Sequence, residues 1–511
     1  MKIFLLLFSI LIVRIGFSQE TPVGIFQNST DIGKPKNAGS TVFDEATQTY
    51  TMKGSGYNIW FNRDEFQFAY KKLTGDFILT GNFQLIGKGT DGHRKIGWMV
   101  RENLNEDAAH VSAAVHGDGM IALQWRKLRG AFMRDPEDEL ISQKKANQIM
   151  QLERVGKKFI MRIANPGEPL QVLGMYEANE IPDAVYVGIF ICAHNADLYE
   201  QANICNVRID RPVPENYSTS KEGWLGCRLE VMNVFDGKRK VIHTAKGRFE
   251  APNWMPDGKK LLFNENGSLY KIPIEGGTPE LLNTDAIKRN NNDHVISFDG
   301  KMLGISSHRD GLPGGGSTVY ILPLEGGTPR LLTEKTPSYL HGWNPNGKEV
   351  VYVGQRETKA FNIYKMAVTG GPEIALTNNP TGVSDGPEFS PDGKYIYYNS
   401  NVTGTMQIWR MKPDGSEKEQ LTFDEYNNWF PHISPDGKWM VIISFPSEMN
   451  SDLHPSFKRV MLRLMPVNGG APKVIAYMYG GQGTINVPSW SPDSKRIAFV
   501  SNSERAEAIA K

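Results

Sequence analysis

The chain has 511 residues, of which 40% are apolar and 22% are charged, the proportions of a globular protein long enough for two or three domains. Its formal net charge is +1, so no overall excess of charge favours nucleic acid or an anionic membrane surface as a partner. The three cysteines, Cys192, Cys205 and Cys227, allow at most one internal disulfide. Cys192 and Cys205 lie in apolar runs that could be neighbouring strands, and small buried thiols are an equally good interpretation.

Residues 1–18 have the composition of a secretory signal peptide. Lys2 supplies the positive start, residues 3–13 form an apolar stretch too short to span a membrane, and Gly16 and Ser18 give small residues at a cleavage site. No cysteine stands directly after that cleavage site, and no later apolar run has the length of a membrane helix. We expect an exported protein, periplasmic or secreted, without a lipid anchor or a transmembrane segment.

Residues 20–210 alternate between apolar and polar positions in a series of short runs. Examples are DFILTGNFQLIG (76–87), KIGWMVREN (95–103) and KFIMRIAN (158–165). A period of two is typical of strands, and few helical periods interrupt it, which predicts an antiparallel β-sandwich of jelly-roll type. The pattern resembles the laminin-G or concanavalin-like jelly rolls often attached to carbohydrate-active enzymes. A linker rich in proline and serine follows at 211–223.

Six segments in the second half of the chain share one pattern. They are MPDGKKLLF (255–263), SFDGKMLGI (297–305), NPNGKEVVY (344–352), SPDGKYIYY (390–398), SPDGKWMVI (434–442) and SPDSKRIAF (491–499). Pro-Asp-Gly is a turn sequence and a β-rich run follows it, so each segment predicts a hairpin. Their spacing of about 42–57 residues is that of propeller blades.

A second hairpin signal, built on a glycine turn, lies between these copies, as in LEGGTPRLL (324–332). Two hairpins in each period make a four-stranded blade. The sixth copy of this second signal is missing after residue 499 and stands before the first blade as VFDGKRKVI (234–242). The two ends of the region therefore share one blade, which hides the edge strands. We predict an all-β chain with a six-bladed propeller over 224–505, and its repeats resemble those of TolB-like propellers.

The unrepeated residues gather at one mouth of the predicted channel. The turns inside the hairpins lie on one face of the ring, whereas the links into strand one and the loops from strand two to strand three lie on the other face. All the histidines within the six repeats fall in this second set: His294, His308, His341, His432 and His454. Converging loops of this kind commonly carry function, so this mouth is the candidate site.

This mouth resembles that of oligogalacturonate lyases, which are also propellers with similar repeats. In those enzymes a His/Gln metal site binds the uronate carboxylate, a base removes the C5 proton, and the C4 substituent is expelled. The resemblance implies a divalent metal, Mn²⁺ or Ca²⁺, held by His294, His341, His432 and Gln482. It also implies a catalytic group of His341 as the base, Tyr339 as the proton donor to the C4 oxygen, and His432.

Six residues of the same mouth are expected to bind the substrate: Arg309, Arg356, Asp385, Trp429, Lys458 and Arg459. The cations would neutralise a carboxylate or sulfate. Trp429 has no counterpart among the repeated tryptophans and would stack on a sugar ring. The implied function is β-elimination at a uronic acid residue of an anionic oligosaccharide or polysaccharide, by a lyase or a dehydratase that acts as a monomer.

Two other classes stay open. A glycoside hydrolase would use Asp385 and Glu388, which lie only three residues apart although such groups must flank a bond. A non-catalytic TolB-like scaffold would bind glycans or proteins, and a smooth, histidine-poor mouth would favour it. The sequence contains no G-x-S-x-G elbow, no Walker loop, no dinucleotide fingerprint next to a strand–helix unit, and no H-E-x-x-H or Cys-rich zinc pattern. Nucleic acid is not an expected partner.

Overall fold

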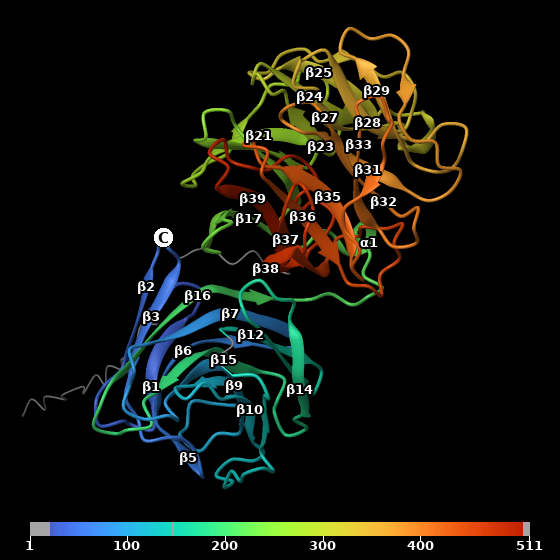
Figure 1. Cartoon of the computed structure of the whole chain (residues 1–511). Coiled ribbons are helices and arrows are strands. Elements are labelled where there is room, and N and C mark those ends of the chain that lie inside the picture. Colours follow the sequence, from blue (N-terminus) through green and yellow to red (C-terminus); the bar gives the residue numbers. More distant parts are fainter. Residues whose placement is uncertain (1–20, 146–147, 504–511) are drawn as a thin grey trace, which may run out of the picture.

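A computed structural model describes residues 21–145 and 148–503, and it consists almost wholly of antiparallel strands. Its only helical segments there are the four-residue helix α1 (Thr219–Glu222) and the 3-10 helix η1 (Pro313–Gly316). The all-β class is confirmed (Figure 1). Neither described helix has the length and apolar character needed to cross a membrane. The predicted signal peptide lies outside the described residues.

The N-terminal part forms two seven-stranded sheets, called here the N-terminal sheets. The first has the order β1 (Asn28–Ile32), β6 (Phe66–Leu73), β15 (Val185–Cys192), β8 (Lys95–Arg101), β9 (His110–His116), β10 (Ile121–Arg126) and β11 (Glu139–Ile141). The second has the order β14 (Gln171–Glu177), β13 (Lys158–Ala164), β12 (Ile149–Val155), β7 (Phe77–Ile86), β16 (Glu200–Asp210), β3 (Thr49–Gly54) and β2 (Ser40–Asp44). A short hairpin joins β4 (Ile59–Trp60) to β5 (Arg63–Asp64).

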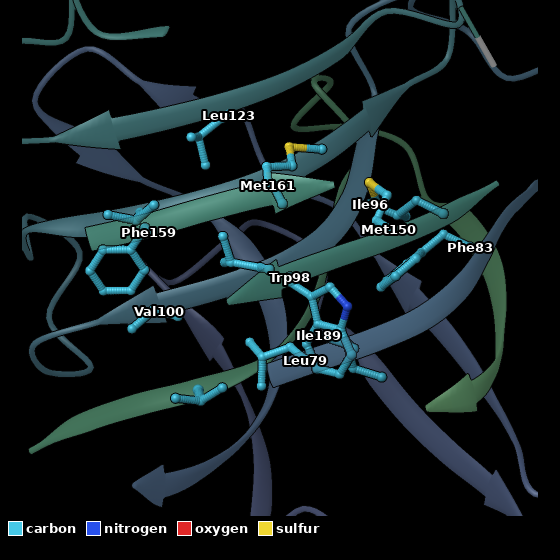
Figure 2. Packing of buried hydrophobic residues seen from close by; sticks show 14 of the residues in the cluster. Leu79, Phe83, Ile96, Trp98, Val100, Leu123, Met150, Phe159, Met161 and Ile189 are labelled. Carbon is cyan, nitrogen blue, oxygen red and sulfur yellow. The ribbon is translucent and has the colours of Figure 1, made fainter. Parts of the chain in front are cut away.

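One hydrophobic core lies between these two sheets (Figure 2). Alternate residues of β8, among them Trp98, point into it and meet Leu79 and Phe83 of the second sheet. Trp98 is wholly buried, and its ring meets that of Phe83 edge-on at 5.8 Å between centroids. Two antiparallel sheets are therefore present where the alternation placed strands, and the resemblance to laminin-G jelly rolls stays a prediction. All three cysteines are free.

Five four-stranded sheets follow, each in chain order, and they are blades one to five. Blade one has β19 (Phe249–Trp254), β20 (Lys260–Glu265), β21 (Ser268–Pro273) and β22 (Glu280–Leu281). Blade two has β23 (Asn290–Ile296), β24 (Met302–Ser307), β25 (Thr318–Pro323) and β26 (Arg330–Leu331), and blade three has β27 (Ser338–Trp343), β28 (Glu349–Gly354), β29 (Asn362–Ala367) and β30 (Ile374–Ala375). Blade four has β31 (Ser384–Phe389), β32 (Ile396–Ser400), β33 (Gln407–Met411) and β34 (Glu419–Gln420), and blade five has β35 (Asn427–Ile433), β36 (Trp439–Phe445), β37 (Lys458–Pro466) and β38 (Lys473–Gly480).

Blade six is shared by the two ends of the propeller. Its strands β18 (Arg239–Ala245) and β17 (Gly226–Asn233) come first in the chain, and β17 pairs along its length with β39 (Arg496–Ser503). The segment 484–490 forms the innermost position and joins β39 through the Val500 N–H, which donates to the Thr484 carbonyl at 3.0 Å. The predicted six blades and the predicted mode of closure are both confirmed.

The innermost strand of each of blades one to five contains a β-bulge. The pairing register shifts between Glu250 and Asn253, Asn290 and His294, Leu340 and Gly342, Asp385 and Glu388, and Trp429 and His432. Three of these bulges contain a residue with left-handed backbone, Ala251 (φ 56°), Gly386 (φ 59°) or Phe430 (φ 52°). A bulge bends its strand and turns a side chain to a new direction, which here decides what faces the channel.

The N-terminal sheets pack against the outer edge of blades five and six. A β-bridge joins Gly167 to Val474, and the Gln48 amide exchanges two hydrogen bonds of 2.9 Å with the backbone of Val241. In Figure 1 the N-terminal sheets lie against the propeller on the side of β17 and β38. The contact therefore involves the strands that close the ring.

A buried ion cluster lies at the centre of this contact. Glu230 of β17 accepts hydrogen bonds from Arg208 of β16 at 2.6 Å and from Arg239 of β18 at 2.6 and 2.8 Å. The Ser501 hydroxyl of β39 donates to the same carboxylate at 2.5 Å. Burial alone would raise the pKa of Glu230, but the two guanidinium groups hold it well below its usual range.

Replacing Glu230 with Gln should destabilise the protein strongly, because two buried guanidinium groups would lose their counter-ion. We expect a loss of about 3–5 kcal/mol in the free energy of unfolding, measured by denaturant titration. The depressed pKa means that this stabilisation is complete above the ordinary pKa of 4.5 and is lost as the pH falls further. The E230Q protein should lack that acid-sensitive component.

The matched control is Glu275→Gln in blade one. Glu275 pairs with Lys240 at 3.6 Å, but its side chain is 81% exposed, so we expect a change below about 1 kcal/mol. Equal stability of the Glu230 and Glu275 variants would show that the buried cluster does not hold the two parts together.

Candidate functional site

A cavity of about 330 Å³ lies at the channel mouth. Its polar lining consists of Arg248, Asn291, Asn292, Asp293, His308, Tyr339, His341, Asp385, Asp452, His454, Gln482 and Asn486. These residues come from the innermost strands, from the links that lead into them, or from the long loops after strand two, the parts that the repeats leave variable. The predicted face therefore carries a real cavity with titratable groups.

One position in each repeat supplies much of this lining. It stands eight residues before the glycine, or Ser494 in blade six, that ends the Pro-Asp-Gly turn. In blades two to six its occupants all line the cavity: Asn292, Tyr339, Asp385, Trp429 and Asn486. In blade one the position is Glu250, which contacts the lining residue Arg248 at 2.7 Å. In blades one, three, four and five the bulge follows this residue closely.

The bulges also decide which histidines face the cavity. His341 is the extra residue in the bulge of β27, with Leu340 and Gly342 paired on either side of it, and it lines the cavity. His294 and His432 come after their bulges and pair again with the neighbouring strand, and neither lines the cavity. The expectation that His294, His341, His432 and Gln482 converge is therefore wrong for two of the four.

His432 joins three blades instead of serving the cavity. Its Nδ1 lies 2.7 Å from Glu388 Oε2 of blade four, and its Nε2 lies 2.7 Å from the Ile485 carbonyl of blade six. The Ile433 N–H donates to the other oxygen of Glu388 at 2.9 Å. With both ring nitrogens engaged, His432 is not free for a metal or for proton transfer, and Glu388 is not available as a hydrolase carboxylate.

His294 is wholly buried, and burial lowers its pKa to about 4. Gln482 does line the cavity, where its amide oxygen accepts a hydrogen bond from Asn486 at 3.2 Å. Within residues 21–145 and 148–503, no group of three or more His, Cys, Asp and Glu residues is placed to hold a metal ion. The predicted set of Mn²⁺ or Ca²⁺ ligands does not fit this arrangement.

His341 is the centre of a charge cluster. Its Nε2 lies 3.2 Å from Asp385 Oδ1 and 3.9 Å from Asp293 Oδ1, and its ring stacks on Phe430 at 5.9 Å. Burial opposes a charge on the imidazole, but the two carboxyl groups outweigh it and raise the pKa of His341. This arrangement favours an imidazolium and not the free base that the sequence suggested.

The pKa values of the two carboxyl groups in this cluster are shifted in opposite directions. Burial raises the pKa of Asp293 to about 7, whereas for Asp385 the contact with His341 outweighs burial and lowers the pKa. Near neutral pH the cluster therefore holds an ionised Asp385 beside an Asp293 carboxyl group that can still carry its proton. Such a separation is typical of groups with different roles in proton transfer.

His454 is another imidazole of the cavity lining, and the sequence placed it at the mouth without assigning it a role. Its Nε2 lies 3.8 Å from Asp385 Oδ2, and its ring meets those of Trp429 and Phe430 edge-on at 4.3 and 5.1 Å. Burial lowers its pKa, so it is neutral at pH 7. Its buried Nδ1 makes no hydrogen bond to any described residue. The lengthened loop that carries it was the available signal.

Two more lining residues complete the site. Burial raises the pKa of Tyr339 to about 12, so its phenol keeps its proton throughout the physiological range. Arg248 pairs with the buried Glu250, and its guanidinium lies 4.1 Å from the Trp224 ring centroid. Arg248 lies outside every repeated motif, so no sequence signal indicated it.

Trp429 and Arg356 have structural roles that differ from the expected ones. Trp429 forms part of the cavity wall but is wholly buried, because His454 packs on it, so its ring offers no face to a sugar. Arg356 contacts both carboxylate oxygens of Glu373 at about 3 Å and the Ser338 hydroxyl at 2.9 Å. It is held within blade three and does not line the cavity.

The remaining predicted cations also lie away from the cavity lining. Arg309 is exposed in the loop before η1, and Lys458 is half-buried at the start of β37. Arg459 pairs with Glu153 of β12 and therefore belongs to the contact with the N-terminal sheets. The positions of Arg309, Lys458 and Arg459 therefore do not support a role in substrate binding at the mouth.

Comparisons with known proteins concern the propeller. The model of the TolB beta propeller domain family matches residues 342–463. The uncharacterized protein Atu1656 of Agrobacterium fabrum is 44% identical over 284 residues, which cover 55% of this chain and 94% of the relative. The solved structure of a putative TolB from Agrobacterium tumefaciens has 43% identity and a TM-score of 0.51, covering 54% of this chain and 98% of its own.

An oligogalacturonate lyase in complex with manganese also aligns, with 10% identity and a TM-score of 0.34, over 56% of this chain and 77% of its own. A similarity at that level carries no argument about the reaction. The match with Atu1656 is of another kind, since it spans almost the whole relative at high identity. Through its propeller, this chain belongs to the family of TolB-like β-propeller proteins that includes Atu1656.

Proposed function

We propose that the mouth cavity is the active site of a lyase or dehydratase that catalyses β-elimination at a uronic acid residue of an anionic oligosaccharide. One observation carries this proposal: the cavity brings together His454 with a lowered pKa, His341 and Asp293 with raised pKa values, and the phenol of Tyr339. Elimination beside a carboxylate needs a base for the C5 proton, donors for the developing negative charge, and an acid for the C4 oxygen.

His454 is the base in this proposal, in place of His341. A base must be unprotonated at the working pH, and burial lowers the pKa of His454, whereas the neighbouring carboxyl groups raise that of His341. The His454 side chain lines the cavity and is 24% exposed, and its buried Nδ1 has no protein partner among the described residues. In this proposal the ring turns so that the Nδ1 lone pair meets the C5 proton.

The developing charge on the uronate carboxylate meets two donors at the centre of the site. The His341 imidazolium offers positive charge, and Asp293 offers a carboxyl proton at and below about pH 7. Arg248 lies in the same lining and gives a second cation for the carboxylate. Because His341 and Asp293 are already buried, they stabilise the transition state without reorganising water.

Tyr339 supplies the proton for the leaving oxygen. As His454 takes the C5 proton, the electron pair of that C–H bond forms the C4–C5 double bond, and the C4–O bond breaks with its electrons on oxygen. The phenol, which keeps its proton up to a pKa of about 12, protonates that oxygen. Another sugar at C4 leaves as a new chain end, and a free hydroxyl leaves as water.

A glycoside hydrolase is the second candidate, with Asp293 as acid and Asp385 as base. Both carboxyl groups lie within 4 Å of the same nitrogen of His341, and their pKa values are shifted in opposite directions. Inverting hydrolases use a pair of this kind about 6.5–9.5 Å apart. Glu388, the other carboxylate considered from the sequence, is bound to His432.

We further propose that the protein acts as an exported monomer on glycan fragments, in line with the signal-like residues 1–18.

His454→Ala should lower the rate of elimination by about 100-fold or more, because a positioned general base contributes that much to the rate. The assay incubates purified full-length protein with uronate-ended oligosaccharides, with and without Mn²⁺ or Ca²⁺. The product has a double bond conjugated with its carboxylate, so near-ultraviolet absorbance follows the reaction directly.

His93→Ala is the matched control, since His93 is an exposed imidazole in the N-terminal sheets and should not affect the rate. Release of reducing sugar without absorbance would contradict elimination and favour the hydrolase. Binding of the oligosaccharide without any product, both with and without each metal ion, would favour the non-catalytic scaffold.

Asp385→Asn should move the alkaline limit of activity to lower pH. In the proposed reaction His341 and Asp293 must both be protonated, and the negative charge of Asp385 raises the pKa of each. Removing that charge should lower the limit by about 1–3 pH units, read from the pH dependence of kcat/KM.

Asp452→Asn is the control for this shift. Asp452 also lines the cavity, but its nearest partner is Asn401, at 2.5 Å, so the alkaline limit should stay in place. An unchanged limit in the Asp385 variant would remove His341 and Asp293 from the proposed chemistry.

A further inference from the structure

A second and larger recess lies between the N-terminal sheets and the propeller. It has a volume of about 920 Å³ and is called here the interdomain groove. One wall is formed by β3, β7 and β16 of the second N-terminal sheet, and the other by turns and strands of blades five and six. It shares no lining residue with the mouth cavity and lies on the side of the Gly turns.

The sheet wall presents a row of amide groups. Asn203 of β16 lies directly opposite Gln84 of β7 in the ladder, and Asn82 follows two residues along β7 on the same face. Their neighbour Phe83 points the other way, into the hydrophobic core. The Asn203 oxygen accepts a hydrogen bond from the Thr51 hydroxyl at 3.1 Å, and the amide donors and the other acceptors of the row match the hydroxyl groups of sugars.

The blade wall presents aromatic rings and cations. Phe235 is 56% exposed and meets the half-buried Trp439 edge-on, with 5.9 Å between ring centroids. Phe235 stands in the displaced glycine turn of blade six, where the aligned positions in the other blades are Glu275, Glu325, Thr369, Asp414 and Asn468. Lys238 and Lys473 are exposed on this wall.

The two walls are fixed relative to each other by contacts beside the groove. The Asn206 amide donates to the Gly237 carbonyl at 2.9 Å, and the Arg239 N–H donates to Asn206 at 3.2 Å. The bridge between Gly167 and Val474 ties another part of the rim. The groove is therefore preformed, as ligand sites between domains commonly are.

We propose that the interdomain groove binds a segment of an acidic oligosaccharide. Amides on one wall bind ring hydroxyls, the aromatic pair on the other wall packs on an apolar ring face, and the lysines attract carboxylates. This site does not depend on the proposed reaction, because it shares no residue with the catalytic cavity. It would hold an acidic chain on the propeller face opposite the active site.

The test uses calorimetric titration of the full chain carrying His454→Ala, with an oligogalacturonide of five residues as the probe. We expect that Gln84→Ala combined with Phe235→Ala removes one equivalent of bound probe, or weakens that site by about tenfold or more. Both side chains are exposed, so the fold should persist, and an unchanged Tm checks this.

The matched control combines Gln201→Ala with Phe423→Ala, which removes an exposed amide and a 78% exposed ring outside the groove. It should bind the probe like the parent protein. Unchanged stoichiometry and affinity in the Gln84 and Phe235 variant would overturn the proposal, whatever the elimination assay gives. Equal binding of a neutral glucose pentasaccharide would overturn the preference for acidic chains.

Discussion

The pairing of β17 with β39 is the constraint on which the rest of the structure depends. These strands are far apart in the sequence, and their ladder converts a row of blades into a closed ring. Because β17 also carries Glu230, the same ladder receives Arg208 from the N-terminal sheets. Ring closure and the attachment of the first part of the chain are thus one interaction.

Closure gives the mouth its rigid frame, and the bulges give it its chemistry. Each inner strand would otherwise place its alternate side chains between blades, where they pack against neighbours. A bulge frees one position to face the channel, so the site gathers residues that are distant in sequence. Burial then raises the pKa of Asp293 and lowers that of His454, whereas the contact with His341 lowers the pKa of Asp385 against the effect of burial.

The blades could be predicted from the sequence because turn signals are local and repeat. The mouth could be assigned to one face for the same reason. Individual side chains could not be placed, because His294 and His341 hold the same aligned position and differ only in the bulge before them. The contact of His432 with Glu388 joins two blades, and no spacing in the chain indicates such a pair. The positions of Arg248 in the mouth and of Phe235 in the groove could not be predicted, because neither residue belongs to a repeated pattern.

The shared blade also orders events during synthesis. Strand β17 is made early, yet one of its edges has no partner until β39 has left the ribosome, so the ring forms late and as a unit. The N-terminal sheets are complete by Asp210 and can fold before that point. Blade six, by contrast, exists only once both ends of the propeller are present. A nascent chain therefore carries folded N-terminal sheets beside an open strand edge, and β39 protects that edge from pairing with another chain.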